Sequence, residues 1–270
     1  MLKQRVLTAI ALVAVLLVVM LGLPTYATVW LVTVLILIGA WEWAAFIGNG
    51  SNPARAAFTI AIAASLIVCI FIYLNGNSPD LVRIVMTAAM VWWMVAFLWV
   101  CLAPERVHPL AAGLAGLMAL VPCWLALVYV TIKTEHTYWV LFTLALVWAA
   151  DTGAFFAGRW FGRVPLAPRV SPKKTWEGVF GGMIASALVA WFAARFLIAV
   201  EVWPFVGICI AVAAVSIIGD LTESMLKRAV GLKDSGSFFP GHGGMLDRID
   251  SVTAAAPALV FALIGLKVIP

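Results

Sequence analysis

The sequence has 270 residues, of which 65% are hydrophobic and only 11% are charged, with a formal net charge of +5. Soluble globular chains carry about a quarter charged residues and roughly half apolar residues. The composition therefore excludes a soluble globular domain, a disordered chain and a collagen-like chain, and it predicts an integral membrane protein. All 4 cysteines lie inside apolar runs without a C-x-x-C pair, which argues against a zinc site or a disulfide framework.

The apolar residues are grouped in runs of about twenty, the length that a helix needs to cross the hydrocarbon core of a bilayer. We predict an all-α polytopic integral membrane protein with about nine transmembrane helices. The run after Lys3 and Arg5 exceeds the usual core of a signal peptide and lacks a small-residue cleavage site near Pro24, so we predict a retained helix. The predicted spans cover residues 6–23, 27–47, 56–74, 81–102, 110–132, 138–157, 177–199, 203–222 and 251–268.

Loop charges indicate the orientation, because cytoplasmic loops of membrane proteins are enriched in Lys and Arg. Nine spans place the two termini on opposite sides of the membrane. With the N-terminus inside, 13 of the 17 basic residues face the cytoplasm, and we therefore predict a cytoplasmic N-terminus and an external C-terminus. The 13 are Lys3, Arg5, Arg55, Arg106, Arg159, Arg163, Arg169, Lys173, Lys174, Lys227, Arg228, Lys233 and Arg248.

Loop length divides the chain into two regions. Residues 1–137 form an N-terminal region with predicted spans 1–5 and short connections. Residues 138–270 form a C-terminal region with spans 6–9 and two long, polar, cytoplasmic loops at 158–176 and 223–250. Long loops in a compact protein are usually functional, so we predict that the C-terminal region is catalytic.

Asp151 lies within a run that otherwise predicts a membrane span. A carboxylate in such a place costs about 2.5–3.5 kcal/mol on insertion scales, so it faces protein or water and is a functional candidate. The alternative is a structural carboxylate that pairs with an arginine such as Arg159 and only locks helices together.

Two further acidic groups lie at the ends of the last two predicted spans. Asp220 is followed by Glu223 and Ser224 at spacings that place all three on one face of a helix. Asp247 and Asp250 repeat the spacing of three at the start of the last span. Complementing a helix dipole explains one of the latter two carboxylates, but not both groups. Such oxygen ligands suit Mg²⁺, which takes one or two protein carboxylates together with water and phosphate oxygens.

Basic residues and glycines surround these acids. The lysines alone fit the positive-inside signal and attraction to anionic head groups, worth about 1 kcal/mol per residue. Neighbouring glycines favour a second role, because they let backbone N–H groups approach a phosphate at a helix N-terminus. For Gly181 and Gly182 close helix packing is an equally good alternative. The residues are Ser171, Lys173, Lys174, Gly178, Gly181, Gly182, Lys227, Arg228, Lys233, Gly241, His242, Gly243, Gly244 and Arg248.

These features predict an enzyme that carries out a metal-assisted reaction on phosphates at the cytoplasmic boundary, with one substrate entering from the lipid. The alternative is an ion- or proton-coupled transporter that uses the intramembrane acids. The acids gather at one face rather than along a path across the bilayer, which favours the enzyme. Trp residues near the span ends fit aromatic belts, and we expect no nucleic-acid partner. For Glu42, a functional acid or an interfacial residue, we favour the interfacial interpretation.

The C-terminal motifs resemble one family closely. The segment from Ser224 to Asp250, with S-M-L-K-R, K-D-S-G and F-P-G-H-G-G-M-L-D-R-I-D, resembles the signature of the phosphatidate cytidylyltransferase family, also called CDP-diacylglycerol synthases. The upstream D-T-G-A, F-G-R, S-P-K-K-T-W-E-G and G-D-L-T-E-S segments are similar to that family too. The resemblance implies Mg²⁺-dependent transfer of a cytidylyl group from CTP to phosphatidate, in phospholipid biosynthesis. It also implies a helical homodimer in the bacterial cytoplasmic (inner) membrane, with a cytoplasm-facing cavity.

The resemblance also suggests roles for the polar residues, which we state as a hypothesis. The resemblance implies a two-cation centre, in which the second cation beside Mg²⁺ could be monovalent. The metal ligands are Asp220 and Asp247, with Asp250 and Asp151 as additional carboxylates. The catalytic group is Asp220, Lys227, Arg228, Asp247 and Asp250. The substrate-binding group is Ser171, Lys173, Lys174, Ser224, Lys233, His242, Gly243, Gly244 and Arg248, with His242 as a hydrogen-bond partner rather than a base.

Overall fold

The computed structural model describes residues 13–48, 51–76, 78–134, 137–236, 238 and 243–269. Within these ranges, 8 helices are long and apolar enough to cross a membrane. They are α2 (Thr25–Trp43, extended by the 3-10 turn Ala44–Ile47), α3 (Asn52–Leu74), α4 (Ser78–Leu102), α5 (Pro109–Thr134), α6 (Tyr138–Phe161), α7 (Trp176–Phe196), α8 (Val202–Ala229) and α9 (Leu246–Gly265). A shorter apolar helix covers Val13–Gly22.

The prediction of a multi-pass helical membrane protein is confirmed. Each predicted span from the second to the ninth has a helical counterpart in the structure. The first predicted span, 6–23, lies partly outside the described residues, and the helix Val13–Gly22 covers its second half. The orientation of the chain across the membrane stays a prediction.

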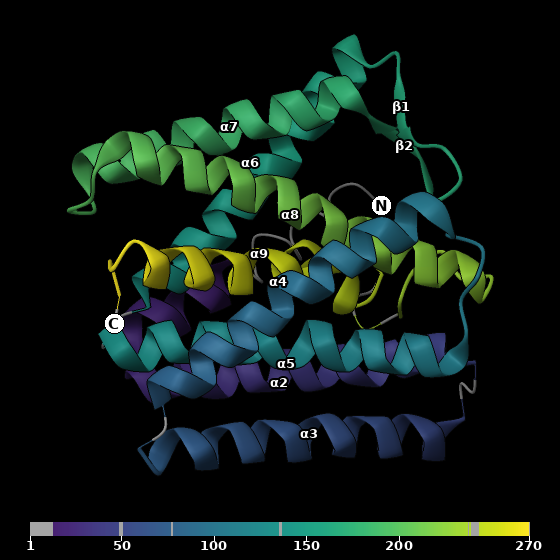
Figure 1. Ribbon diagram of the computed structural model, residues 1–270, viewed down its shortest axis with the longest axis horizontal. Coiled ribbons are helices and arrows are strands. Elements are labelled where there is room, and N and C mark those ends of the chain that lie inside the picture. The colour runs from purple at the N-terminus through teal and green to yellow at the C-terminus, as the bar shows by residue number, and fades with distance from the viewer. Residues whose placement is uncertain are drawn as a thin grey trace.

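Helices α5 and α9 form the centre of the helix assembly. Of the membrane-length window of α5, 72% is buried inside the protein, compared with 61% for α9 and 17% for α3. Figure 1 shows α3 along one edge and α7 along the opposite edge, with α9 between the two groups of helices. Helix α9 contacts α2, α4, α5, α6 and α8. Helix α9 is therefore held in place by five other helices.

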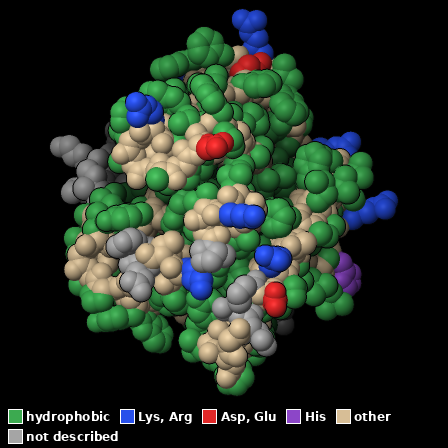
Figure 2. All heavy atoms as spheres, turned by 60° about the vertical axis from the view of Figure 1, so that its left-hand side comes forward, with side chains coloured by type: hydrophobic (Ala, Val, Ile, Leu, Met, Phe, Trp, Pro, Cys, Tyr) green, Lys and Arg blue, Asp and Glu red, His purple; other side chains and the backbone are tan. Residues whose placement is uncertain are grey.

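The outer surface is apolar over wide areas. Large hydrophobic side chains of α3, α4 and α7 are exposed, including Phe71, Ile84 and Phe180, each at more than 60%. Figure 2 shows a face on which hydrophobic side chains predominate and charged side chains are few. Such a surface suits a lipid environment, because its side chains are apolar and the helical backbone satisfies its own hydrogen bonds.

Small residues allow α6 and α7 to pack closely. A Cβ atom added at Gly181 would lie 2.2 Å from Cβ of Ala157, and one added at Gly153 would lie 2.5 Å from the carbonyl oxygen of Gly181. Gly182 likewise approaches the carbonyl oxygen of Ala150, at 2.7 Å from its added Cβ. The close-packing interpretation therefore holds for both glycines, in keeping with helix pairs in membranes.

The predicted loop 223–250 is wrong at both ends. Helix α8 continues through Lys227 to Ala229, and α9 begins at Leu246, so the connection is shorter by a turn or more at each end. The polar side chains of Glu223 and Lys227 are buried, so they contact protein rather than lipid although they belong to a helix. Lys227 and Arg228 also complement the negative end of the helix dipole.

The predicted loop 158–176 is also partly wrong, and the chain is not purely helical. Helix α6 runs on to Phe161, and an antiparallel hairpin follows, formed by β1 (Pro165–Ala167) and β2 (Ser171–Thr175). Helix α7 starts directly after β2, because the N–H group of Gly178 donates to Oγ1 of Thr175 at 3.2 Å and caps the helix. The hairpin thus delivers Lys173 and Lys174 beside the start of α7.

Candidate active site

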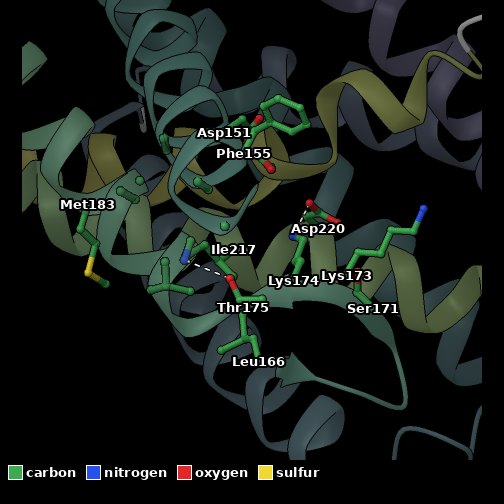
Figure 3. A pocket seen from close by; sticks show the side chains of 18 of the residues that line it. Asp151, Phe155, Leu166, Ser171, Lys173, Lys174, Thr175, Met183, Ile217 and Asp220 are labelled. Atoms are coloured by element: carbon green, nitrogen blue, oxygen red, sulfur yellow. Dashed lines mark hydrogen bonds and ion pairs between the residues drawn. The ribbon is translucent and has the colours of Figure 1, made fainter. Parts of the chain in front are cut away.

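A cavity of about 580 Å³ lies between α6, the hairpin, α7, α8 and α9. All of its lining residues belong to the predicted C-terminal region 138–270. Figure 3 shows Asp151 and Asp220 extending into the same space from α6 and α8. The polar side chains in the lining are Asp151, Arg159, Ser171, Lys173, Lys174, Thr175, Asp220 and Ser251.

Lys174 and Asp220 form an ion pair in this cavity. The Lys174 ammonium contacts Oδ2 of Asp220, and the Ser224 hydroxyl donates to Oδ1 of the same carboxylate at 3.2 Å. Both charged side chains stay about one-quarter exposed, at 28% and 24%. Figure 3 shows that the ammonium end of Lys173 points away from Asp220. The two adjacent lysines therefore hold different positions.

Asp151 lines the cavity as an accessible carboxylate. Among the residues that the structure describes, Asp151 and Arg159 form no ion pair, although both line the cavity. The alternative in which these two residues only lock helices together is therefore wrong. Asp151 instead adds a second negative group beside Asp220.

A second charged cluster joins α8 to α9. The Lys227 ammonium lies 2.7 Å from Oδ1 of Asp247 and 3.2 Å from Oε1 of Glu223. The side chains are nearly buried, with 10% of Lys227, 11% of Asp247 and 2% of Glu223 exposed. One buried cation is thus shared between two carboxylates from different helices.

The other oxygen of Asp247 accepts two backbone hydrogen bonds. Oδ2 receives the N–H groups of Ser235 at 3.0 Å and Gly244 at 2.8 Å. Gly243 has φ of 83°, a conformation that side chains rarely adopt, and an added Cβ would lie 2.7 Å from Oδ2 of Asp247. The backbone of Gly243 and Gly244 therefore packs closely against the Asp247 carboxylate.

The interfacial interpretation of Glu42 is wrong. Its side chain is buried at 4% exposure, and its carboxylate accepts the N–H groups of Met245 at 3.1 Å and Leu246 at 2.8 Å. The Ser235 hydroxyl donates to Oε2 of Glu42 at 3.0 Å. The sequence analysis named Glu42 but favoured the interface, and it did not include Ser235 among the candidate residues. The available signal was an acid inside an apolar run, the same signal that identified Asp151.

Three other predicted site residues, Arg228, Lys233 and Asp250, are not among the lining residues of the cavity. Arg228 is exposed and donates from Nη1 to the carbonyl oxygen of Leu232 at 3.4 Å, and Lys233 is exposed beyond it. Asp250 lies where α9 crosses α8, with Oδ1 accepting the N–H group of Ser251 at 2.6 Å. His242 lies outside the described residues.

Arg248 borders a second, apolar cavity of about 320 Å³. This cavity lies between the first turns of α9 and residues of α2, α5, α6 and the helix Val13–Gly22. Arg248 is the one charged side chain among its described lining residues. Helix α9 therefore contributes to the lining of both the polar and the apolar cavity.

The polar cavity contains oxygen donors of the kind that Mg²⁺ prefers. Asp151 and Asp220 supply two carboxylates, and Mg²⁺ usually keeps several waters and takes one or two protein carboxylates. In the described part of the chain, no three His, Cys, Asp or Glu side chains converge as a metal site. Asp151 and Asp220 are therefore the carboxylates that the cavity lining offers to such an ion.

Residues 3–265 match the sequence model described as the cytidylyltransferase family. The chain belongs to this family. It is accordingly a nucleotidyltransferase, as the C-terminal motifs led us to expect. The match covers nearly the whole chain, including the helices of the N-terminal half that carry no recognisable motif.

Individual relatives support the same assignment. The chain is 40% identical over 281 residues to the phosphatidate cytidylyltransferase of Haemophilus influenzae, covering 95% of this chain and 96% of that protein. It is 38% identical over 269 residues to the phosphatidate cytidylyltransferase of Pseudomonas aeruginosa, covering 97% and 96%. The corresponding protein of Brucella suis is 45% identical over 120 residues, 44% of each chain.

Proposed function

We propose that this chain transfers the cytidylyl group of CTP to phosphatidate, releasing pyrophosphate and giving CDP-diacylglycerol for phospholipid synthesis. The observation that carries the proposal is the cavity in which Lys174 pairs with Asp220 opposite Asp151, in a member of the cytidylyltransferase family. Relatives that match it over nearly their whole length are phosphatidate cytidylyltransferases.

The reaction needs charge neutralisation and alignment more than a protein nucleophile. A phosphate oxygen of phosphatidate attacks the α-phosphorus of CTP, forming a new P–O bond. The bond from the α-phosphorus to the bridging oxygen breaks, and its electron pair leaves with pyrophosphate. Lys173 and Lys174 in the cavity bind phosphates of the two anionic substrates, and Ser171 assists them by hydrogen bonding.

The proposed metal ligands are Asp220 and Asp247, with Asp151 and Asp250 as additional carboxylates. Asp151 and Asp220 line the cavity, which supports their part directly. Asp247 shares Oδ1 with Lys227, so a cation there would lie next to an ammonium group. When bound, Mg²⁺ supplies neutralisation of the phosphate charge that builds up during transfer. A second, monovalent cation is also proposed, and titration of the activity with a monovalent salt at fixed Mg²⁺ tests for it.

The decisive experiment follows both products of the purified protein in detergent. CTP, phosphatidate and Mg²⁺ together should give CDP-diacylglycerol and pyrophosphate in equal amounts, and omission of any one of the three should stop both. Release of pyrophosphate without phosphatidate, or absence of the lipid product, would contradict the proposal. Ion flux through reconstituted protein without consumption of CTP would favour the transporter alternative.

We also propose that the site faces the cytoplasm of a bacterial inner membrane. The hairpin lysines and the α8–α9 connection carry the basic residues that the positive-inside rule assigns to that side. In a Cys101→Ser background, a cysteine replacing Lys233 should resist an impermeant maleimide in spheroplasts, whereas one replacing the exposed Glu201 should react. The reverse pattern would overturn the orientation. A homodimer, also proposed, predicts twice the mass of 29.0 kDa by light scattering after subtraction of detergent.

A further inference from the structure

Glu42 is a buried carboxylate that belongs to the N-terminal half of the chain but contacts the start of α9. It lies near the end of α2, and its side chain is 4% exposed. A Cβ atom added at Gly236 would lie 2.3 Å from Oε1 of Glu42, and one added at Gly244 would lie 2.4 Å from Oε2. The absence of side chains at Gly236 and Gly244 thus makes room for the Glu42 carboxylate.

The Glu42 carboxylate satisfies backbone donors at the N-terminus of α9. The first N–H groups of a helix have no partners within it, and a negative group there also complements the helix dipole. Met245 occupies the capping position and has no polar side chain to accept a hydrogen bond. Glu42 accepts the N–H groups of Met245 and Leu246 in its place. An acid more than 200 residues earlier in the chain therefore caps this helix.

Ser235 connects Glu42 to Asp247. Its hydroxyl donates to Oε2 of Glu42 at 3.0 Å and accepts the N–H group of Asp247 at 3.2 Å. Its backbone N–H group donates to Oδ2 of Asp247 at 3.0 Å. The connection between Glu42 and Asp247 therefore runs through one residue and uses both its side chain and its backbone.

We infer that Glu42 is a positioning residue for cytidylyl transfer, which fixes the Asp247 carboxylate against Lys227 through Ser235 and the first turn of α9. The inference rests on the proposed function, because it takes Asp247 as part of the site. A buried charge in a membrane protein is expensive and usually functional. An apolar side chain in α2 would pack the same space but would leave the donors of Met245, Leu246 and Ser235 without an acceptor.

Glu42→Gln tests the inference with little change in side-chain shape. The amide group turns one acceptor into a donor, so it opposes an N–H or hydroxyl donor at the start of α9. We expect kcat to fall by about 10- to 100-fold, as displacement of a catalytic group by an ångström can do. KM for CTP and for phosphatidate should change by less than about threefold, because the cavity that contains Lys174 is intact.

The matched control is Thr33→Val in the same helix. Thr33 accepts a hydrogen bond from Nε1 of Trp124 at 2.8 Å, so the control also removes a partly buried polar contact of α2, but not one with α9. Amide hydrogen exchange of segment 243–247, measured without substrate, should speed up in Glu42→Gln and stay at the wild-type rate in Thr33→Val. A merely structural role of Glu42 predicts equal loss of kcat in the two variants at equal loss of thermal stability, and that result would overturn the inference.

A double-mutant comparison with Ser235→Ala sharpens the test. If Glu42 acts through Ser235, the double variant should lose little more kcat than the more damaged single variant, since residues in one network are not additive. Fully additive losses, or unchanged exchange in segment 243–247, would contradict the inference. Absence of transfer by the wild-type protein would instead contradict the proposed function, and the exchange rates would still decide whether Glu42 holds the start of α9.

Discussion

The Lys227 ammonium lies 2.7 Å from Oδ1 of Asp247 and thereby joins the last turn of α8 to the first turn of α9. Glu223, one helical turn before Lys227, contacts the same ammonium at 3.2 Å. Buried ion pairs contribute little net stability when they form, but removal of one partner leaves a buried charge uncompensated. Both carboxylates share Lys227, so loss of Lys227 should destabilise the protein more than loss of either carboxylate alone.

Lys227→Met should therefore destabilise the protein by about 3–5 kcal/mol, the usual cost of breaking a buried pair from one side. Thermal unfolding in detergent and the yield of folded protein measure this effect. Lys227→Arg keeps the charge and should retain most of the stability.

The double variant Lys227→Met with Glu223→Gln separates charge balance from packing. It removes one negative group together with the positive one, so it should be more stable than Lys227→Met alone. Equal melting temperatures of the single and double variants would show that the missing charge is not the cause of the loss.

Lys173 and Lys174 are adjacent in sequence but should differ in function. Lys174 contacts Asp220 inside the cavity, whereas Lys173 is exposed at its margin. We expect Lys174→Met to lower kcat/KM for CTP by about 100-fold or more, because it removes a phosphate-binding charge and leaves Asp220 without its counter-ion. Lys173→Met should cost about tenfold or less, as expected for an exposed charge.

Steady-state kinetics over a range of CTP and phosphatidate concentrations distinguish these two effects. Glu105→Gln, an exposed acid in the α4–α5 connection, controls for a change of charge far from the cavity. Equal losses in the two lysine variants would contradict the different positions that we assign to them.

Hydropathy was sufficient to predict eight of the helices, because a run of about twenty apolar residues has few alternatives in a membrane protein. It misplaced the ends of α8 and α9, since buried polar residues such as Glu223 and Lys227 give a helix the composition of a loop. The short strands β1 and β2 carried no alternation of apolar and polar residues that could have revealed them.

The site was predictable in its residue types and less so in its pairings. Spacing placed Asp220 beside Ser224 on one helix face, and the structure shows the hydrogen bond between them. The contact of Lys174 with Asp220 spans 46 residues, and that of Glu42 with Leu246 spans 204, so no local pattern could predict either. The hydropathy context of Glu42 even favoured a different location, because tertiary packing decides whether an acid between tryptophans is interfacial or buried.

Arg248 should affect phosphatidate more than CTP. Its side chain borders the apolar cavity, whose lining shares no residue with the cavity that contains Lys174 and Asp220. Arg248→Ala should raise KM for phosphatidate by about tenfold, the equivalent of one charge-assisted contact of roughly 1.5 kcal/mol, with a smaller change for CTP. Arg195→Ala is the matched control, because Arg195 is exposed in the last turn of α7 and lines neither cavity. A larger effect on KM for CTP would contradict the position of Arg248.

Gly181 should be intolerant of even one added methyl group. A Cβ atom at this position would lie 2.2 Å from Cβ of Ala157, so α6 and α7 must separate to admit it. Overpacking of this kind costs about 1–3 kcal/mol, and the separation would also move the wall of the cavity that carries Asp151. Gly181→Ala is therefore expected to lower both the melting temperature in detergent and kcat.

Gly207→Ala provides the control for the change from glycine to alanine in a helix. Gly207 lies in α8 with no atom within 4 Å of an added Cβ, so its replacement should leave activity unchanged and leave stability unchanged or slightly raised. If Gly181→Ala melted at the wild-type temperature, α6 and α7 would not be in the close contact that positions Asp151 opposite Asp220. Because the hairpin and its lysines follow α6 directly, the fit of these two helices determines the geometry of the cavity.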